Sequence, residues 1–129
     1  MYHFSQGSKD RLNTLHPDLQ FLLHKAIMIM DFSVTWGVRN ETEQNTIFEK
    51  GASKLQYPDS KHNKEPSQAV DIDPYPIDYK DVRRYYILAG IMKALAKEHN
   101  IKIRWGGDWD SDNDLTDQTF NDLAHFELV

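Results

Sequence analysis

The stretch Ser60–Asp73, S-K-H-N-K-E-P-S-Q-A-V-D-I-D, decides how this chain is organised. Its segment Ala69–Asp71 predicts a short strand that ends in a carboxylate and follows a polar loop containing His62. A second stretch, Asn121–Leu128 (N-D-L-A-H-F-E-L), predicts a closing strand that begins near His125. Neighbouring strands lie about 4.8 Å apart, so side chains on two adjacent strands can meet. We therefore expect the fold to bring these two stretches together.

The side chains of His62, Asp71 and His125 match the donor set of a catalytic zinc site. Two neutral imidazoles and one carboxylate are typical where a fourth coordination position stays open to water. Asp122, three residues before His125, is suited to accept a proton from that water. Asp73 is a rival ligand to Asp71. A hydrogen-bonded or surface histidine, and a carboxylate that only caps a strand, are the structural alternatives.

Five blocks of sequence resemble the zinc L-alanyl-D-glutamate peptidases of phage endolysins, which are relatives of the D-alanyl-D-alanine carboxypeptidases and dipeptidases. The blocks cover nearly the whole chain in the order of that family: S-K-D-R-L-N-T-L-H-P-D-L from Ser8, F-S-V-T-W-G-V-R from Phe32 with E-Q after it, S-x-H from Ser60 followed by A-V-D-I, W-G-G-D-W from Trp105, and D-L-x-H-F-E-L from Asp122. The loop between His62 and Asp71 is longer than is usual in the family, and a longer loop costs little closure entropy.

The resemblance implies roles for two residues outside the zinc ligands. Asp122 takes the place of the general base, which passes a proton to the leaving amine; the carboxypeptidase branch usually has glutamate there. Arg39 resembles the family arginine that stabilises developing oxyanion charge or holds a substrate carboxylate, because a guanidinium is a planar, permanently charged donor. The alternative for Arg39 is a surface arginine paired with Glu41 or Glu43.

Three further residues are expected around the site. Ser60 either bonds the substrate or only caps its loop. Glu127 alternates with His125 along the closing strand, so we expect it to orient that imidazole. Trp109 is predicted to line the cleft, whereas Trp105 is expected in the core.

An acidic run suggests a second metal. Asp110, Asp112 and Asp114 stand at alternate positions, as at the start of a calcium-binding EF-hand loop. Leu115 occupies the position of the glycine of that loop, however, and no glutamate stands where its bidentate ligand belongs. A solvated acidic loop is the alternative. A calcium ion there would be regulatory, because the loop leads directly to Asp122.

Length and composition predict one globular domain over residues 1–129, without a separate cell-wall-binding domain. Hydrophobic residues make up 40% and charged residues 27%, and the absence of cysteine excludes disulfides and thiolate metal sites. A formal net charge of -5 argues against nucleic acid as a partner. No apolar run approaches the ~20 residues that span a bilayer, so we expect no stable membrane association. The N-terminus shows no secretory signal, and we expect a monomer.

The hydrophobic periodicity predicts an α+β fold in which two long helices pack on a small, mostly antiparallel sheet. The resemblance implies the arrangement found in Hedgehog and D-Ala-D-Ala peptidase domains. A capping box at Asn40 and Glu43 marks the start of a shorter helix. The predicted elements are helices over Leu15–Met30, Asn40–Gly51 and Tyr79–His99, and strands over Phe32–Val38, Ala69–Asp71, Ile101–Trp105 and Ala124–Val129.

By resemblance, we expect a zinc metallopeptidase that hydrolyses the L-alanyl-D-glutamate bond of bacterial peptidoglycan and acts as a phage endolysin in host lysis. Such a protein is made in the host cytoplasm and reaches the cell wall through a separate pore-forming protein. A D-alanyl-D-alanine carboxypeptidase is the alternative among enzymes. A zinc-bearing but non-catalytic wall-binding module is the alternative from a different class.

Overall fold

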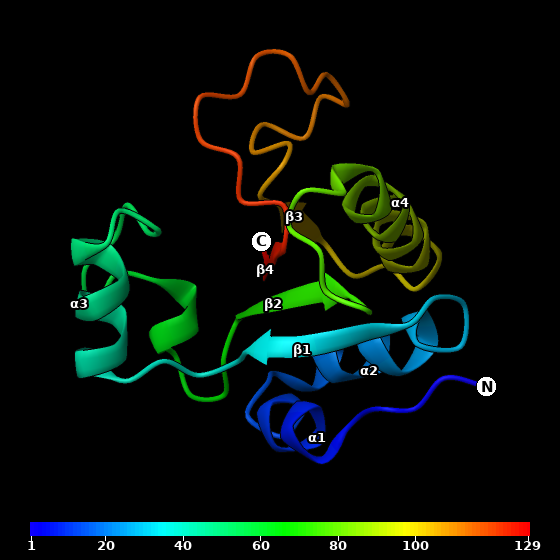
Figure 1. The fold of residues 1–129 in the computed structure, drawn as a ribbon, viewed down its shortest axis with the longest axis horizontal. Coiled ribbons are helices and arrows are strands. Elements are labelled where there is room, and N and C mark those ends of the chain that lie inside the picture. Colours follow the sequence, from blue (N-terminus) through cyan, green and yellow to red (C-terminus); the bar gives the residue numbers. More distant parts are fainter.

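A four-stranded antiparallel sheet in the order β1-β2-β4-β3 forms the centre of the fold in the computed structural model, which describes residues 1–129 (Figure 1). The helices and strands are α1 (Gln6–Leu12), α2 (Pro17–Ala26), β1 (Phe32–Trp36), α3 (Glu41–Glu49), the short 3-10 helix η1 (Lys61–Asn63), β2 (Ala69–Pro74), α4 (Val82–Glu98), β3 (Ile103–Trp105) and β4 (His125–Leu128). This arrangement has the α+β class that the periodicity predicts. No helix combines the length and the apolar composition that a membrane crossing requires.

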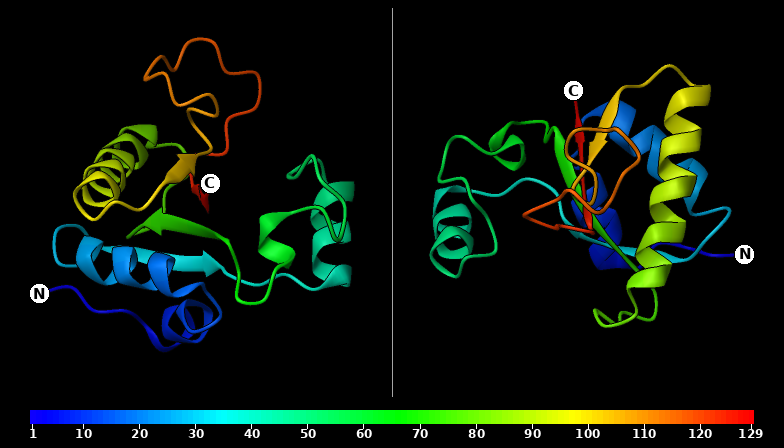
Figure 2. Two further views of the ribbon diagram at one scale, coloured as in Figure 1. Left: turned by 180° about the vertical axis from the view of Figure 1, so that it is seen from behind. Right: turned by 90° about the horizontal axis from the view of Figure 1, so that it is seen from above.

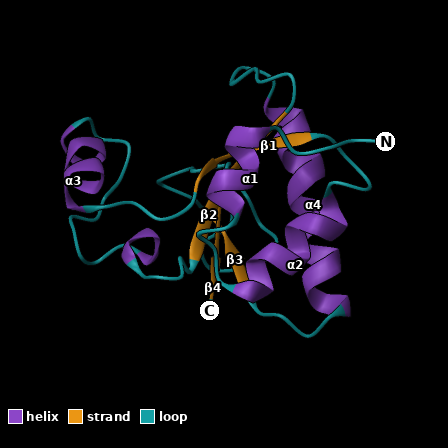
Figure 3. Cartoon of the chain, turned by 90° about the horizontal axis from the view of Figure 1, so that it is seen from below, coloured by secondary structure: helices purple, strands orange, loops and turns teal.

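Three helices cover one side of the sheet, and α3 stands apart on the other side (Figures 2 and 3). Helix α1 packs on β1, while α2 and α4 pack on each other and α4 also contacts β2 and β3. The hydrophobic core lies between these helices and the sheet, and its largest fully buried members include Leu19, Leu22, Leu23, Phe32, Ile72, Leu88, Met92 and Phe126. The opposite side of the sheet is therefore free to carry polar chemistry.

The N-terminal helical region differs from its prediction. The predicted helix over Leu15–Met30 is too long, mainly at its C-terminal end. Helix α2 starts at Pro17, where the His16 Nδ1 atom accepts a hydrogen bond from a backbone N–H, and it ends at Ala26. A separate helix, α1, precedes it and is capped by Ser5. The hydroxyl of Ser8 then accepts a hydrogen bond from the Val34 N–H at 2.9 Å, which ties α1 to β1.

Helix α3 starts as predicted but buries a polar side chain. The capping box between Asn40 and Glu43 is present in both directions, and Gly51 follows the helix with a φ of +79°. Its apolar residues Ile47 and Phe48 are only half-buried. Gln44 is the fully buried residue of this helix. The reason is that α3 has no apolar layer to pack against and instead anchors the polar loops around it.

Strand β2 extends beyond its predicted end at Asp71, because it is a central strand and its last residues pair with β1. It runs to Pro74 and pairs with β1 on one side and β4 on the other, and all six of its residues are buried. The register places Asp71 directly opposite His125 on β4. Opposed residues of an antiparallel pair project to the same face of the sheet. The two strands thus bring a carboxylate and an imidazole together.

Candidate active site

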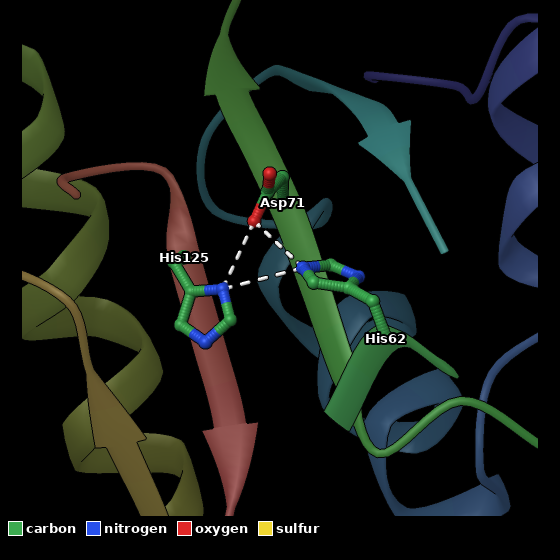
Figure 4. A group of neighbouring side chains, drawn as sticks. All are labelled: His62, Asp71 and His125. Carbon is green, nitrogen blue, oxygen red and sulfur yellow. Dashed lines mark hydrogen bonds and ion pairs between the residues drawn. The ribbon is translucent and has the colours of Figure 1, made fainter. Parts of the chain in front are cut away.

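His62, Asp71 and His125 meet on the face of the sheet that the three core helices leave free (Figure 4). The His62 Nε2 atom lies 3.2 Å from Asp71 Oδ1 and 3.3 Å from His125 Nδ1, and His125 Nδ1 lies 3.2 Å from Asp71 Oδ1. Donors held about 2.0–2.1 Å from a tetrahedral zinc ion are themselves about 3.3–3.4 Å apart. The triangle formed by these three atoms therefore has the size of one face of a zinc coordination tetrahedron.

In each of the three side chains, the nitrogen or oxygen atom that points away from the triangle forms a hydrogen bond to another group. His62 Nδ1 lies 2.8 Å from the Gly37 carbonyl, which can only accept, so this nitrogen carries the proton and Nε2 keeps its lone pair. His125 Nε2 lies 2.8 Å from a Glu127 carboxylate oxygen, and Arg39 Nη2 donates to Asp71 Oδ2 at 2.8 Å. These outer partners fix the tautomers and orientations that a metal needs, as in known zinc sites. The donor set and its surroundings fit a zinc ion.

The electrostatics of the three side chains also favour a cation between them. Burial lowers the pKa of His62, which keeps it neutral. Burial alone would raise the pKa of Asp71, but His62 and His125 hold it well below its usual range. Burial likewise opposes the charged form of His125, yet the hydrogen bonds to Asp71 and Glu127 raise its pKa to about 9. A proton on His125 and a metal ion are thus alternative ways to neutralise the flanking carboxylates.

The loop that presents His62 is fixed by its own hydrogen bonds. The Ser60 hydroxyl caps η1 by accepting a hydrogen bond from the His62 N–H, and the Ser60 N–H donates to Asn63 Oδ1 at 3.0 Å. The Arg39 N–H donates to the His62 carbonyl at 2.8 Å, which ties η1 to the end of the β1 region. The capping role of Ser60 is therefore present in the structure, and its hydroxyl also lines the cleft.

Asp122 lies beside the triad without joining it. Its Oδ2 atom is 4.0 Å from His125 Nδ1, and the residue is half-buried in the turn before β4. Burial and the charge of Asp71 raise the pKa of Asp122 to about 6. The backbone of Gly106 holds this turn, because the Asp122 N–H donates to its carbonyl at 2.8 Å. A side chain at position 106 has no space, since a Cβ there would lie 2.1 Å from the Asp122 carbonyl oxygen.

Arg39 is buried at the site and does not form the surface ion pair considered above. The alternative pairing with Glu41 or Glu43 is wrong, because the Arg39 guanidinium bonds Asp71 and lies over the Trp36 ring at 4.9 Å. Burial lowers the pKa of Arg39 from its very high ordinary value. Its Nε–H has no partner and is buried. Arg39 therefore retains unused donor capacity next to the triad.

A cleft of about 500 Å³ opens onto His62, His125, Asp122 and Arg39. Trp109 lines it as predicted, with its ring 5.4 Å from the His125 ring and 6.3 Å from that of Phe120. Most of the remaining lining comes from the loop after α3 and from the long loop that rises above the sheet (Figure 1), and it includes Ser53, Lys54, Leu55, Gln118, Thr119 and Phe120. Lys61 of η1 and Glu127 of β4 also contribute.

Two other predicted positions have clear outcomes. Asp73 is not near the triad, because its carboxylate accepts hydrogen bonds from Thr35 at 2.8 Å and from the hydroxyl of Tyr85. Trp105 is buried in the core, as expected. Its indole N–H donates to the Leu123 carbonyl at 2.8 Å, which supports the turn that carries Asp122.

The acidic loop gathers a different set of carboxylates from the one predicted. Asp110 and Asp112 lie close to Asp108, whereas Asp114 turns away and accepts hydrogen bonds from Thr116. The inclusion of Asp114 in a calcium site is therefore wrong in this structure. Asp108 is fully buried and paired with Lys93 at 3.1 Å. Calcium binding by the loop stays a prediction.

Two contributors were not singled out by the sequence. The Gly37 carbonyl fixes the tautomer of His62, but a backbone group has no signal in the sequence. Gln44 of α3 accepts a hydrogen bond from Arg39 and donates one to the Leu55 carbonyl. In the sequence, Gln44 appears only as part of the block E-Q.

Comparisons with known proteins agree along the whole chain. The family described as phage L-alanyl-D-glutamate peptidase matches residues 1–129. The L-alanyl-D-glutamate peptidase of Escherichia phage T5 is 29% identical over 136 residues, which cover 99% of this chain and 98% of that protein. The crystal structure of the Serratia marcescens L-Ala D-Glu endopeptidase ChiX superposes with a TM-score of 0.79 at 26% identity, covering 100% of this chain and 90% of that one.

Proposed function

This chain belongs to the phage L-alanyl-D-glutamate peptidase family, and we propose that it hydrolyses the L-alanyl-D-glutamate bond of peptidoglycan stem peptides with one zinc ion. His62, Asp71 and His125 are the proposed zinc ligands, Asp122 is the proposed general base, and Arg39 is the proposed electrophilic residue. The relatives of phage and bacterial origin are named as peptidases for this bond, which supports both the enzyme class and the substrate.

One observation carries the proposal of a zinc centre. Three inward-facing donor atoms of His62, Asp71 and His125 lie 3.2–3.3 Å apart, while the opposite atom of each side chain is bonded elsewhere. Such a set of converging lone pairs repels itself unless a cation or a proton stands between them. A zinc ion with three protein ligands supplies Lewis-acid chemistry and lowers the pKa of a water molecule in its open position to about 7.

Asp122 is suited to move the proton that this hydrolysis requires. A pKa of about 6 leaves its carboxylate mostly ionised near neutral pH and still able to release a proton afterwards. Asp122 takes a proton from the attacking water at its carboxylate oxygen and delivers it to the nitrogen that leaves as the D-glutamyl amine. Both transfers use the same cleft-facing group, so no second acid is needed.

Arg39 has two tasks in this scheme. Its Nη2–H bond to Asp71 Oδ2 turns the other carboxylate oxygen towards the two imidazoles. Its positive charge stabilises the negative charge that develops on the oxygen of the scissile carbonyl. Trp109 forms the apolar wall beside His125 and limits the volume in which the peptide can move. Glu127 keeps His125 in the tautomer that leaves Nδ1 free.

The biological role that follows is that of a phage endolysin, made in the host cytoplasm and passed to the cell wall through a separate pore-forming protein. Peptidoglycan is the partner, and we infer a monomer without stable contact to nucleic acid or membrane. The net charge of -5 supports the absence of nucleic-acid binding.

Digestion of purified peptidoglycan, followed by mass spectrometry of the new termini, tests the proposal. We expect newly free D-glutamate amines in the presence of zinc and none after chelation. The variant His62→Ala, which removes one ligand, is the matched control. Release of D-alanine would instead identify a carboxypeptidase, and binding to the wall without new termini would identify a non-catalytic module.

A further inference from the structure

Lys54 differs from the other cations that line the cleft because it has no anionic partner. Arg39 is paired with Asp71 at 2.8 Å, and Lys61 lies 3.3 Å from Glu127. Lys54 forms neither an ion pair nor a hydrogen bond, and its ammonium group lies over the Phe120 ring at 5.3 Å. One positive charge of the cleft is therefore free to receive an anion.

The position of Lys54 is fixed although its side chain is exposed. Gln44, which is fully buried in α3, donates from one nitrogen to the Ser53 hydroxyl at 3.0 Å and to the Leu55 carbonyl at 2.7 Å. These two bonds hold the residues on either side of Lys54. The oxygen of the same Gln44 amide faces the Arg39 guanidinium at 3.4 Å. One buried amide thus sets the distance between Lys54 and the proposed catalytic arginine.

The opposite wall leads from Lys54 to the triad through aromatic rings. Phe120 stacks on Trp109 at 6.3 Å, and Trp109 lies 5.4 Å from His125. A peptide bound along this wall runs from the reacting centre towards Lys54. An ammonium group above an aromatic face gains a modest attraction and remains available for a stronger ionic contact. The cleft therefore offers a cation at the end of an apolar track.

We propose that Lys54 is a specificity-determining residue that binds a free carboxylate of the stem peptide on the leaving-amine side of the cleaved bond. This inference rests on the proposed function. The stem peptide has two sources of such a carboxylate beyond the cleaved bond. One is the α-carboxylate of the D-glutamyl residue, which is free because the chain continues through the γ-carboxyl. The other is the carboxylate of a residue further along the peptide.

Amidation of each carboxylate in turn distinguishes the two sources. The substrates are N-acetylmuramoyl-L-alanyl-γ-D-glutamyl-L-lysine with both carboxylates free, with only the D-glutamyl one amidated, and with only the terminal one amidated. The zinc-loaded wild-type protein, Lys54→Met, Lys54→Arg and the control Lys50→Met are compared on all three by mass spectrometry of the products. Lys50 is an exposed lysine four residues earlier that does not line the cleft.

We expect Lys54→Met to raise KM about tenfold on the free acid with kcat unchanged, because the lost contact is charge-assisted and remote from the reacting atoms. Lys54→Arg restores KM, and Lys50→Met behaves as wild type. Amidation of the carboxylate that Lys54 binds raises the wild-type KM to the same value and abolishes the difference between wild type and Lys54→Met. The amide that has this effect identifies the source.

Two results would overturn the inference while the proposed function stands. One is an unchanged KM of Lys54→Met on the free acid. The other is a loss in Lys54→Met that persists equally on all three substrates. If wild-type protein released no D-glutamyl amine from any substrate or from peptidoglycan, the proposed function would itself be wrong, and the inference about Lys54 would fall with it.

Discussion

The substitution Asp122→Asn separates proton transfer from metal binding at this site. Asparagine has almost the same shape as aspartate but cannot accept a proton near neutral pH. The Asp122 Oδ2 atom lies 4.0 Å from His125 Nδ1, whereas the three proposed ligand atoms lie 3.2–3.3 Å from one another. We therefore expect the variant to keep its full zinc content.

The size of the loss follows from the role of a positioned acid–base group. Such a group contributes about 10²–10⁴-fold, so turnover of Asp122→Asn should fall by that factor. The pKa of about 6 also sets the pH profile of the wild-type protein. Because the ionised carboxylate is the active form, the rate should fall about tenfold for each unit of pH well below this value. The proposed zinc ion would stabilise the carboxylate, so the midpoint should lie at or below about 6.

Thermal stability provides an independent check that Asp122→Asn is folded. The pKa of Asp122 is raised from 3.8 to about 6, so its ionised form is less stable in the folded protein than in the unfolded chain. This contribution favours the folded state at low pH and is lost as pH rises through about 6. Asp122→Asn removes the penalty, and we expect the metal-free variant to melt at a higher temperature than wild type at pH 7.

The assays are zinc content by atomic absorption, the initial rate of amine release from peptidoglycan, and thermal unfolding followed by circular dichroism. Full zinc with a near-normal rate would remove Asp122 from the mechanism, and Glu127 would become the next candidate for the base. Loss of zinc would instead show that Asp122 is a ligand or supports one.

Three further predictions address the ligands, the turn and the acidic loop. Asp71→Ala should lose zinc and activity while Asp73→Ala keeps its zinc; the reverse result, read from metal content, would exchange the two assignments. Gly106→Ala should destabilise the fold by about 1–3 kcal/mol, as overpacking does, and should lower the rate by displacing Asp122; an unchanged melting temperature and rate would contradict this. Calcium should raise the melting temperature of the wild-type protein but not that of Asp110→Asn, and an equal response of the two proteins would exclude a calcium site that uses this carboxylate.

The parts of the site that lie on strands could be predicted from the sequence because strand geometry has a fixed period. His125 and Glu127 are two residues apart on β4, so they share a face, and their contact at 2.8 Å follows from that alternation. The capping box of α3 could also be predicted, because its two partners, Asn40 and Glu43, are only three residues apart in the sequence. Local hydrogen bonds and a regular period are properties that one sequence carries by itself.

The parts that could not be predicted depend on contacts between distant segments or on irregular turns. The burial of Gln44 follows from its bonds to the loop at Ser53 and Leu55, which no periodicity shows. In the acidic loop, Ser111 and Asn113 adopt positive φ values of 55° and 64°, so alternate positions no longer point the same way. This is why Asp108, rather than Asp114, joins the carboxylate cluster in the structure.

The separation of core and site explains how this small protein can hold so many buried charges. The apolar core lies between the sheet and helices α1, α2 and α4, which Figure 3 shows on one side of the sheet. The charged groups lie on the other face of the same sheet. There they alternate in sign: Arg39 bonds Asp71, the triad follows, and His125 bonds Glu127, which faces Lys61. Each charge in this series therefore has an oppositely charged neighbour, which limits the cost of its burial. The triad is the position in this series where the flanking carboxylates call for a positive charge, and the proposed zinc ion would supply it.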